Sequence, residues 1–421
     1  MQSLQKVEKQ KKKQTLGASF RRLFAVISMT SLGDGLTFNA LPWLAATITS
    51  NAMFISLVSV CFRLPWLLLS LPFGVIIDRF PRNVLMIISS TIRAITISIL
   101  AFATIGGWVS LPLLIIVTFL FGAAKVMFDS TIQTVVPIIV EKQQLERANG
   151  LFSTAQLITS DILGGALAGM LIMIGLPLPF VIDAVTSTCS IPLLKALRGS
   201  DQIVEKRKHL SFRSDIMEGI RLVKNSSLLR ALAIFSIGMT GPFSSITAVQ
   251  IFFMKEVLNL NALGFGVLIS VATIGSILGG QFVSKIKNKI GTRNSILLAI
   301  AVMGLGYGCT GLSSHWAIVG VLYTISAFFV VVWNIISVSI RQRLVPNELL
   351  GRVNGVFRFL SLGISSIGAF LGGALVSGGE LLVGREWSVR LPYFFLFFVY
   401  TLLFLIAFRF FNVERLKNNI G

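Results

Sequence analysis

The sequence predicts an all-α membrane protein in which twelve transmembrane helices form two bundles of six. Three observations support this fold class: the composition, the number of apolar spans and an internal repeat. Hydrophobic residues make up 54% of the 421 residues and charged residues only 13%, well below the roughly 25% typical of soluble domains. Because the mean hydropathy is also +0.83, we expect an integral membrane protein.

Twelve segments are long and apolar enough to cross a hydrocarbon core of ~30 Å, which takes about 20 residues of helix. They are 20–48, 52–77, 83–105, 110–137, 149–173, 177–196, 229–254, 261–284, 294–313, 316–340, 353–376 and 390–411. The expected organisation is a basic cytoplasmic tail (1–19), an N-terminal six-helix bundle (20–196), a cytoplasmic linker (197–228), a C-terminal six-helix bundle (229–411) and a cytoplasmic C-terminus (412–421). Apolar residues at helical spacing between Phe212 and Val223 predict an amphipathic helix in the linker.

An internal repeat relates the two halves. The stretch "ERANGLF" from Glu146 returns as "GRVNGVF" from Gly351, and "LGGAL" at Leu163 returns at Leu371. Both pairs are about 206 residues apart, and both lie at the entry to, or within, the fifth span of their half. Parallel repeats of this kind are typical of transporters with a substrate path between the halves.

The basic residues are distributed unevenly between the two ends of the spans. Of 37 Lys and Arg residues, 30 lie in the N-terminal tail, the central linker, the even-numbered connections and the C-terminus, whereas the odd-numbered connections hold three. This positive-inside bias predicts that both termini face the cytoplasm. It also explains the net charge of +20, so nucleic acid is not an expected partner.

The connection after the second span has the pattern G-x-x-x-D-R-x-x-R, formed by Gly74, Asp78, Arg79 and Arg82. This pattern resembles the signature loop of the major facilitator superfamily. The stretches "LPWLLLSLPFGVIIDR", "FDSTIQTVVPIIV" and "LGRVNGVF" are similar to the macrolide-efflux and enterobactin-exporter branch of its drug:proton antiporters. The resemblance implies the superfamily's fold and proton-coupled efflux. A plain topology loop is the alternative interpretation of the basic pattern.

Two departures from the drug antiporters limit what the resemblance implies. The fourth span carries Lys125 and Asp129 where the best-known motif has an arginine, and the fifth span, "LITSDILGGALAGM", lacks the antiporter prolines. In the superfamily an acid at the cytoplasmic end of the fourth helix pairs with the loop arginine. By that resemblance Asp129 is expected to act in gating with Arg79 or Arg82.

Seven ionisable residues lie well inside the first-half spans, where an unpaired charge is costly. They are Asp34, Arg63, Arg93, Lys125, Asp129, Asp161 and Asp183. Counting from the span ends places all but Asp129 and Asp183 near the midplane, with an excess of one base. For Asp34, proton or substrate coupling, a static ion pair and a purely conformational role all stay open, and the flanking Gly33 and Gly35 favour close backbone approach or local helix distortion. For Asp161, coupling and a structural ion pair both stay open, and Arg93 is expected to be a counter-ion. Asp183 is expected to be a cap or a surface pair.

The second-half spans carry no acid but many aromatic, Met and small residues, which suit large amphipathic ligands. Gln250, Trp333 and Asn334 are the best candidates for a substrate cavity, because polar groups within a span seek partners. Arg63 and Lys125 are further candidates, which would contact an anionic ligand.

An enzyme is not expected, because the two histidines lie in a linker and at a surface, and no phosphate-binding loop is present. No cofactor or metal is predicted. The predicted function is secondary active, proton-coupled export of an amphipathic, macrolide-type compound by a monomer in the bacterial plasma membrane. Two alternatives stay open: a siderophore or other metabolite exporter in the same fold, and a membrane sensor or scaffold that transports nothing.

Overall fold

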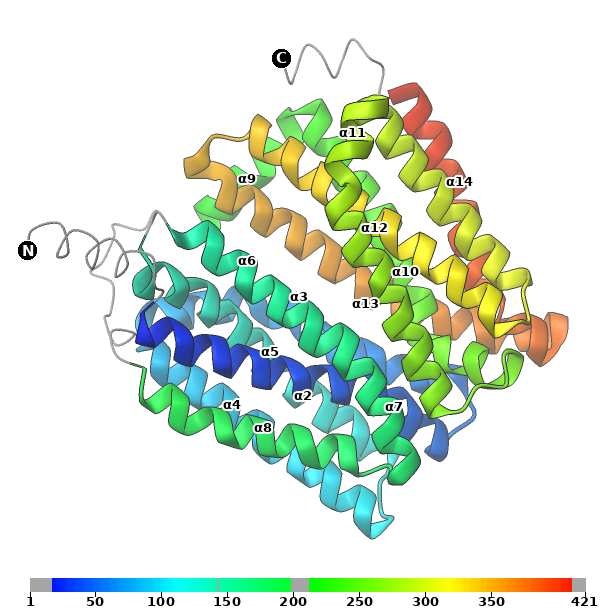
Figure 1. Ribbon diagram of the computed structural model, residues 1–421, viewed down its shortest axis with the longest axis horizontal. Helices are drawn as coiled ribbons and strands as arrows, with labels where there is room; N and C mark the ends of the chain where they lie inside the picture. Colours follow the sequence, from blue (N-terminus) through cyan, green and yellow to red (C-terminus); the bar gives the residue numbers. More distant parts are fainter. Residues whose placement is uncertain (1–16, 142–143, 198–211, 411–421) are drawn as a thin grey trace, which may run out of the picture. The chain divides into compact units, whose positions relative to one another are not determined.

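The computed structural model describes residues 17–141, 144–197 and 212–410, and this part of the chain is helical without strands. The helices of the first half appear in Figure 1 in blue to green. They are α2 (Ala18–Ile48), α3 (Ala52–Arg79), α4 (Arg82–Gly106), α5 (Leu111–Ile139), α6 (Leu145–Gln156), the π-helix η2 (Leu157–Leu163), α7 (Gly164–Ile174) and α8 (Leu178–Lys195).

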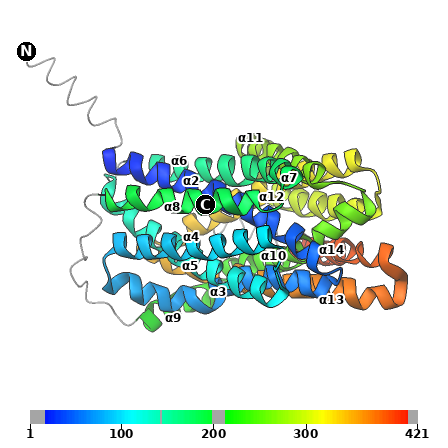
Figure 2. The same ribbon diagram turned by 90° about the horizontal axis from the view of Figure 1, so that it is seen from below.

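The second half begins with a short linker helix and continues with long apolar helices, seen from a second direction in Figure 2. They are α9 (Phe212–Asn225), α10 (Ser227–Phe252), the π-helix η3 (Phe253–Val257), α11 (Ala262–Leu312), α12 (Trp316–Leu344), α13 (Asn347–Ser388) and α14 (Leu391–Phe410). The linker helix was predicted, although the side chains of 212–216 lie outside the described part. From α9, Glu218 forms an ion pair with Arg352 on α13.

The described helices account for twelve crossings. Ten are long and apolar enough by length and composition alone. One of these, α11, has 51 residues, about twice what one crossing needs. Its Gly291 has a φ of 81°, a left-handed conformation that glycine adopts without strain, so α11 is two spans joined at that residue. Together with α2, whose Asp34 lowers its hydropathy, the total is twelve, and the predicted fold class is confirmed.

Two elements differ from the sequence prediction. The eleventh span was expected to end near residue 376, but α13 continues without a break to Gly384, where φ is 77°. No proline interrupts this stretch, so the backbone hydrogen bonds continue. The fifth span is divided into α6, η2 and α7. π-Helical turns accommodate an extra residue and are often found at functional sites.

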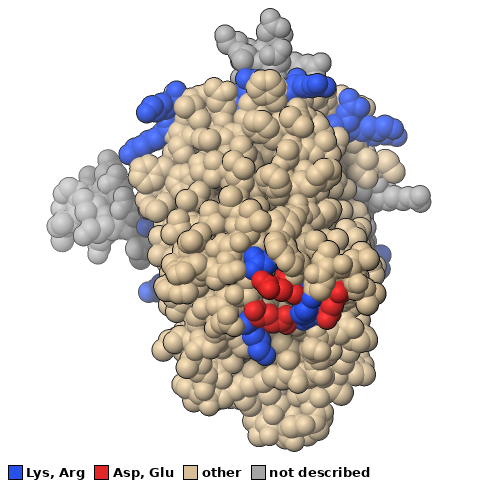
Figure 3. All heavy atoms as spheres, turned by 90° about the vertical axis from the view of Figure 1, so that its right-hand side faces the viewer, with Lys and Arg blue, Asp and Glu red and all other residues tan. Residues whose placement is uncertain are grey.

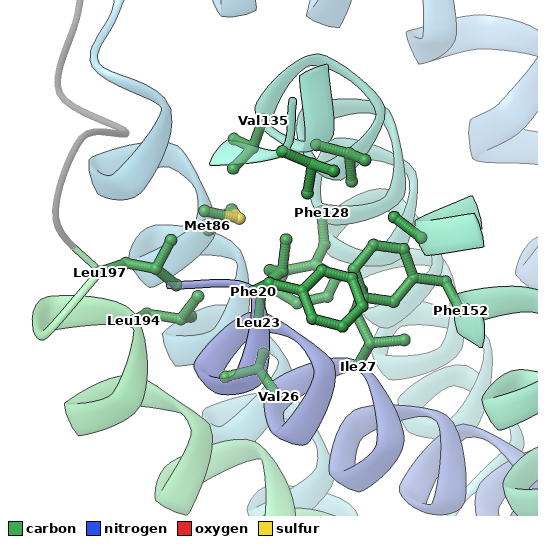
Figure 4. Packing of buried hydrophobic residues seen from close by; sticks show 13 residues of the cluster. Phe20, Leu23, Val26, Ile27, Met86, Phe128, Val135, Phe152, Leu194 and Leu197 are labelled. Carbon is green, nitrogen blue, oxygen red and sulfur yellow. The ribbon is translucent and has the colours of Figure 1, made fainter. Parts of the chain in front are cut away.

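The chain forms two compact units by its internal contacts. Unit 1 comprises Met1–Ala40, Leu68–Val109 and Val117–Arg207, and unit 2 comprises Leu41–Leu67, Ser110–Ile116 and Lys208–Gly421. A core of unit 1, shown in Figure 4, brings residues of α2 against α4, α5, α6 and α8, with the rings of Phe20 and Phe152 4.9 Å apart. Apolar packing of this kind holds the helices that carry the charged residues described below.

In unit 2, glycines allow pairs of helices to approach closely. A Cβ on Gly368 of α13 would meet the backbone oxygen of Gly241 on α10, and a Cβ on Gly372 would meet that of Ser245. Gly275 and Gly279 of α11 contact the backbone of α12 in the same way. Small residues at a spacing of four are a common device for packing membrane helices.

Charged side chains are few on the face shown in Figure 3. One compact group of acids and bases lies there on a largely uncharged surface.

Candidate functional site

Unit 1 contains a cluster of five charged side chains, which we call the ion cluster: Asp34 on α2, Arg93 on α4, Lys125 and Asp129 on α5, and Asp183 on α8. Asp34 binds both cations. Its Oδ1 lies 2.5 Å from Arg93 Nη2, and its Oδ2 lies 2.7 Å from Lys125 Nζ. Each cation also approaches a second carboxylate, because Lys125 Nζ is 3.2 Å from Asp129 and Arg93 Nη2 is 3.7 Å from Asp183. Three carboxylates therefore share two cations.

Asp183 belongs to this cluster and is not the cap or surface pair that was predicted. Its side chain is 0% exposed, and it accepts hydrogen bonds from the hydroxyls of Thr37 (2.5 Å) and Ser187 (3.2 Å). Gly33 makes room for it, because a Cβ there would collide with the Asp183 carboxylate. The buried polar residues Asp183, Ser187 and Ser190 recur at helical spacing. That pattern is the sequence signal from which its burial was predictable.

Arg93 lies at the centre of the cluster with only 1% of its side chain exposed. Its guanidinium carbon is 5.1 Å from the ring centroid of Phe121 and 5.8 Å from that of Phe128, so cation–π contacts supplement its ion pairs. Its Nε and Nη1 are buried and make no hydrogen bond to the described residues. The N–H groups on Nε and Nη1 of Arg93 could therefore still donate a hydrogen bond to one of the two neighbouring carboxylates.

Glycines explain how α2 approaches its neighbours. A Cβ on Gly35 would collide with the backbone oxygen of Ser160 in η2, and a Cβ on Gly164 would lie 2.7 Å from Gly35 Cα. Gly33 and Gly35 thus serve close approach, as one prediction held, while α2 itself stays helical through both positions.

Asp161 and Asp129 are placed differently from their expected partners. Asp161 lies on η2, is exposed, and makes none of the ion pairs among the described residues, so its coupling role stays a prediction. Asp129 pairs with Lys125 rather than with the described arginines Arg79 or Arg82. Gly74 and Arg79 lie near the end of α3 and Arg82 begins α4, while the side chain of Asp78 lies outside the described part.

Unit 2 contains a pocket of about 410 Å³, within the usual size range of small-molecule sites. It is lined by Ser236, Met239, Thr240, Phe243, Met303, Val330, Trp333, Asn334, Ser337, Val338, Arg341, Asn354, Phe357, Arg358, Ser361 and Tyr400. Trp333 and Asn334 were predicted to line a cavity. Arg358 was missed, although it lies inside the eleventh predicted span. No acidic residue is among the lining residues.

The other predicted cavity residues lie elsewhere. The amide of Gln250 donates to Tyr323 Oη (3.2 Å), whose oxygen lies 2.8 Å from that of Tyr393. Gln250 therefore belongs to a polar chain outside the pocket lining. Lys125 lies in the ion cluster. Arg63 lies in unit 2 and contacts three hydroxyls rather than an acid. The ion cluster differs in membership from the predicted midplane set, which included Arg63 and Asp161, and it has one more acid than bases.

A twelve-span helical membrane protein with a shared-carboxylate ion cluster and an aromatic pocket has the architecture of a secondary transporter, not of an enzyme. Residues 23–369 match the Major Facilitator Superfamily model, and the chain belongs to this family. It is 25% identical over 369 residues to the multidrug efflux pump Tap of Mycolicibacterium fortuitum, covering 85% of this chain and 89% of the relative. It is 24% identical over 317 residues to macrolide efflux protein A of Streptococcus pyogenes, covering 72% and 76%.

Solved structures share the fold at lower sequence identity. One structure of the nucleoside transporter NupG superimposes with a TM-score of 0.77 at 14% identity, and another gives 0.72 at 16% identity; each covers 94% of this chain and 100% of its own. A bacterial homologue of the iron transporter ferroportin, in its inward-facing state, gives a TM-score of 0.74 at 15% identity and covers 94% and 99%. The chain is therefore a multi-pass membrane transporter related to efflux pumps.

Proposed function

We propose that this protein is a proton-coupled exporter that expels an amphipathic, drug-like compound from the cytoplasm. Relatives named as multidrug and macrolide efflux pumps support export. The pocket of unit 2 supports an amphipathic substrate, because aromatic and Met side chains such as Phe243, Trp333 and Met239 offer an adaptable apolar wall beside polar groups.

The arrangement around Asp34 is the observation on which proton coupling rests. With all five groups charged, the ion cluster has a net charge of −1, and a buried excess charge is costly. A proton on Asp34 removes that excess and weakens its hold on both cations. Arg93 then turns towards Asp183 and Lys125 towards Asp129, since both carboxylates are already within 4 Å of these cations. Proton uptake is thereby converted into a rearrangement of α2, α4, α5 and α8.

The loop between α3 and α4 is proposed as the gate of this transporter. Gly74, Asp78, Arg79 and Arg82 supply it, and Asp129 is proposed to take part in gating while it pairs with Lys125 within the ion cluster. The charge bias of the connections supports a plasma-membrane protein with both termini in the cytoplasm. The protein is proposed to act as a monomer in a bacterial inner membrane.

The first test compares Asp34→Asn with Asp161→Asn in proteoliposomes. Asn keeps the shape of the side chain but leaves two carboxylates on two cations, so we expect Asp34→Asn to lose pH-gradient-driven transport at least tenfold. Substrate counterflow needs no net proton movement and should persist, which shows that the variant is folded. Asp161→Asn tests the second candidate acid, and gradient-driven transport retained in that variant would limit proton coupling to the ion cluster. Undiminished gradient-driven transport by Asp34→Asn would remove Asp34 from the mechanism.

A dedicated metabolite exporter, for example of a siderophore, is the second candidate. It is favoured by Arg341 and Arg358, two bases among the residues that line the pocket. Growth of an expressing strain against a panel of antibiotics and siderophores separates the two candidates. Protection against several unrelated antibiotics supports the drug exporter, and secretion of one siderophore alone supports the metabolite exporter.

A further inference from the structure

Arg63 is a charged side chain within a transmembrane helix that has no acid beside it. It lies on the part of α3 that belongs to unit 2, and its hydrogen bonds go to hydroxyls of α10 and α13. Nη1 donates to Ser244 (3.0 Å) and to Ser365, and Nη2 donates to Thr247 (3.2 Å). None of the ion pairs among the described residues includes Arg63. Among the described residues, the guanidinium of Arg63 therefore makes hydrogen bonds to neutral hydroxyls and forms no ion pair.

Neutral hydroxyls do not cancel a charge in an apolar surrounding. The cost of removing a guanidinium from water is recovered when a counter-charge and hydrogen bonds meet it together. Arg63 keeps two donors for such a partner, Nε–H and one N–H of Nη2, because its hydrogen bonds to the described residues use three of the five guanidinium N–H groups. The edge formed by Nε and an Nη is the one that binds a carboxylate with two parallel hydrogen bonds.

The hydroxyls around Arg63 continue the polar side of the pocket. Thr240 of α10 and Ser361 of α13 line the pocket, and Ser244 and Ser365 follow each of them by four residues. Residues four apart lie on one face of a helix, about one turn along. Ser244 Oγ also donates to Ser365 Oγ at 2.9 Å, which joins the two helices at this level. Arg63 thus lies one turn beyond the pocket, on the same faces of α10 and α13.

The charged residues that line the pocket also favour an anionic ligand. Its lining includes Arg341 and Arg358 and no acid. Both arginines already stack on rings, with Arg341 4.3 Å from the centroid of Phe357 and Arg358 4.6 Å from that of Trp66. A cationic ligand would meet like charge here, whereas an anion would be attracted.

We propose that Arg63, with Ser244, Thr247 and Ser365, forms a subsite for an anionic group, most simply a carboxylate, of the exported compound. The apolar part of that compound lies in the aromatic pocket one turn away. The inference rests on the proposed export function and narrows it, because the substrates become amphipathic acids rather than amphipathic cations.

The test measures equilibrium binding to the full chain in nanodiscs without a pH gradient. The probes are two acids, fusidic acid and dansyl-11-aminoundecanoic acid, each paired with its methyl ester. Wild-type protein should bind each acid at least tenfold more tightly than its ester. Arg63→Gln should weaken binding of the acids about ten- to hundredfold, the range expected for a charge-assisted contact, and leave the esters unchanged. Arg385→Gln is the charge-matched control, because Arg385 is outside the pocket lining and forms an ion pair with Glu256, and it should leave the affinities for acid and ester unchanged.

Several outcomes would overturn the subsite. Equal affinities of acid and ester in the wild type would exclude an anion site but leave the exporter intact. Equal losses of affinity for acid and ester in Arg63→Gln would indicate that Arg63 only stabilises the packing of α3 against α10 and α13. If Arg63→Gln does not fold, the double variant Ser244→Ala, Ser365→Ala takes its place, and an unchanged preference for the acids would refute the proposal. Failure of every probe to bind would refute the subsite and the pocket together, independently of the Asp34 test.

Discussion

The carboxylate of Asp183 is fully buried, so its charge depends on the donors that surround it. Thr37 and Ser187 supply two hydroxyl donors, and Arg93 Nη2 lies 3.7 Å away. That distance is too long for a hydrogen bond yet short enough for a buried Coulomb interaction. Asp183 thus accepts two hydroxyl hydrogen bonds and has no direct hydrogen bond from Arg93. It is a positioning residue, which acts through Arg93 rather than on the substrate.

Asp183→Asn is expected to reduce gradient-driven transport at least tenfold without loss of fold. The substitution leaves Arg93 without a second carboxylate and removes the excess charge of the ion cluster, so a proton on Asp34 no longer moves the guanidinium. Thr37→Val keeps the carboxylate and removes one donor, which is worth about 1.5–3 kcal/mol for a charged acceptor, so it should slow transport less. Both are measured in proteoliposomes with counterflow as the folding control. A wild-type rate of gradient-driven transport in Asp183→Asn would exclude Asp183 from the coupling mechanism.

At the scale of elements, α10 and α13 are packed backbone to backbone and together carry half of the pocket's lining. Ser236, Met239, Thr240 and Phe243 come from α10, and Asn354, Phe357, Arg358 and Ser361 come from α13. Their spacing is set where Gly368 and Gly372 face the backbone of α10. Because protein interiors are packed as densely as organic crystals, a change in the spacing between α10 and α13 is transmitted to the pocket.

Gly368→Ala should therefore lower stability, whereas Gly378→Ala should not. At position 368 the new methyl group meets the backbone oxygen of Gly241, which cannot rotate away, while nothing lies within 4 Å of a Cβ at 378. Overpacking of this kind costs about 1–3 kcal/mol. Thermal unfolding of the two variants in the same detergent is the measurement, and ligand binding should weaken only in Gly368→Ala. Equal unfolding temperatures would contradict the close packing.

The spans were predictable from the sequence because apolar length is a local property, and the turn at Gly291 fell in an expected connection. The divided fifth span was not predictable, since η2 arises where α2 approaches Ser160, a contact between segments more than a hundred residues apart. Asp34, Arg93 and Lys125 were found because intramembrane charges are rare. Asp183 was missed because depth was counted from span ends, and α8, with 18 residues, does not share the length of α2, with 31.

At the scale of the whole molecule, the ion cluster and the aromatic pocket are formed by different parts of the chain. The ion cluster uses residues of unit 1 alone, and the pocket uses residues of unit 2 alone. The helix α3 belongs to both units, since residues 52–67 are counted in unit 2 and 68–79 in unit 1. It carries Arg63 in its first part and the start of the proposed gate at its end.

The charge bias of the connections predicts which end of the spans faces the cytoplasm. The connection that holds Ser314, between α11 and α12, is flanked by few bases, whereas Ser226 lies between α9 and α10 beside the basic linker. In a variant whose three cysteines are replaced by serine, Ser314→Cys should be labelled by a membrane-impermeant maleimide in intact cells. Ser226→Cys should be labelled only after the cells are permeabilised. The opposite pattern would contradict the predicted cytoplasmic location of the linker and of both termini.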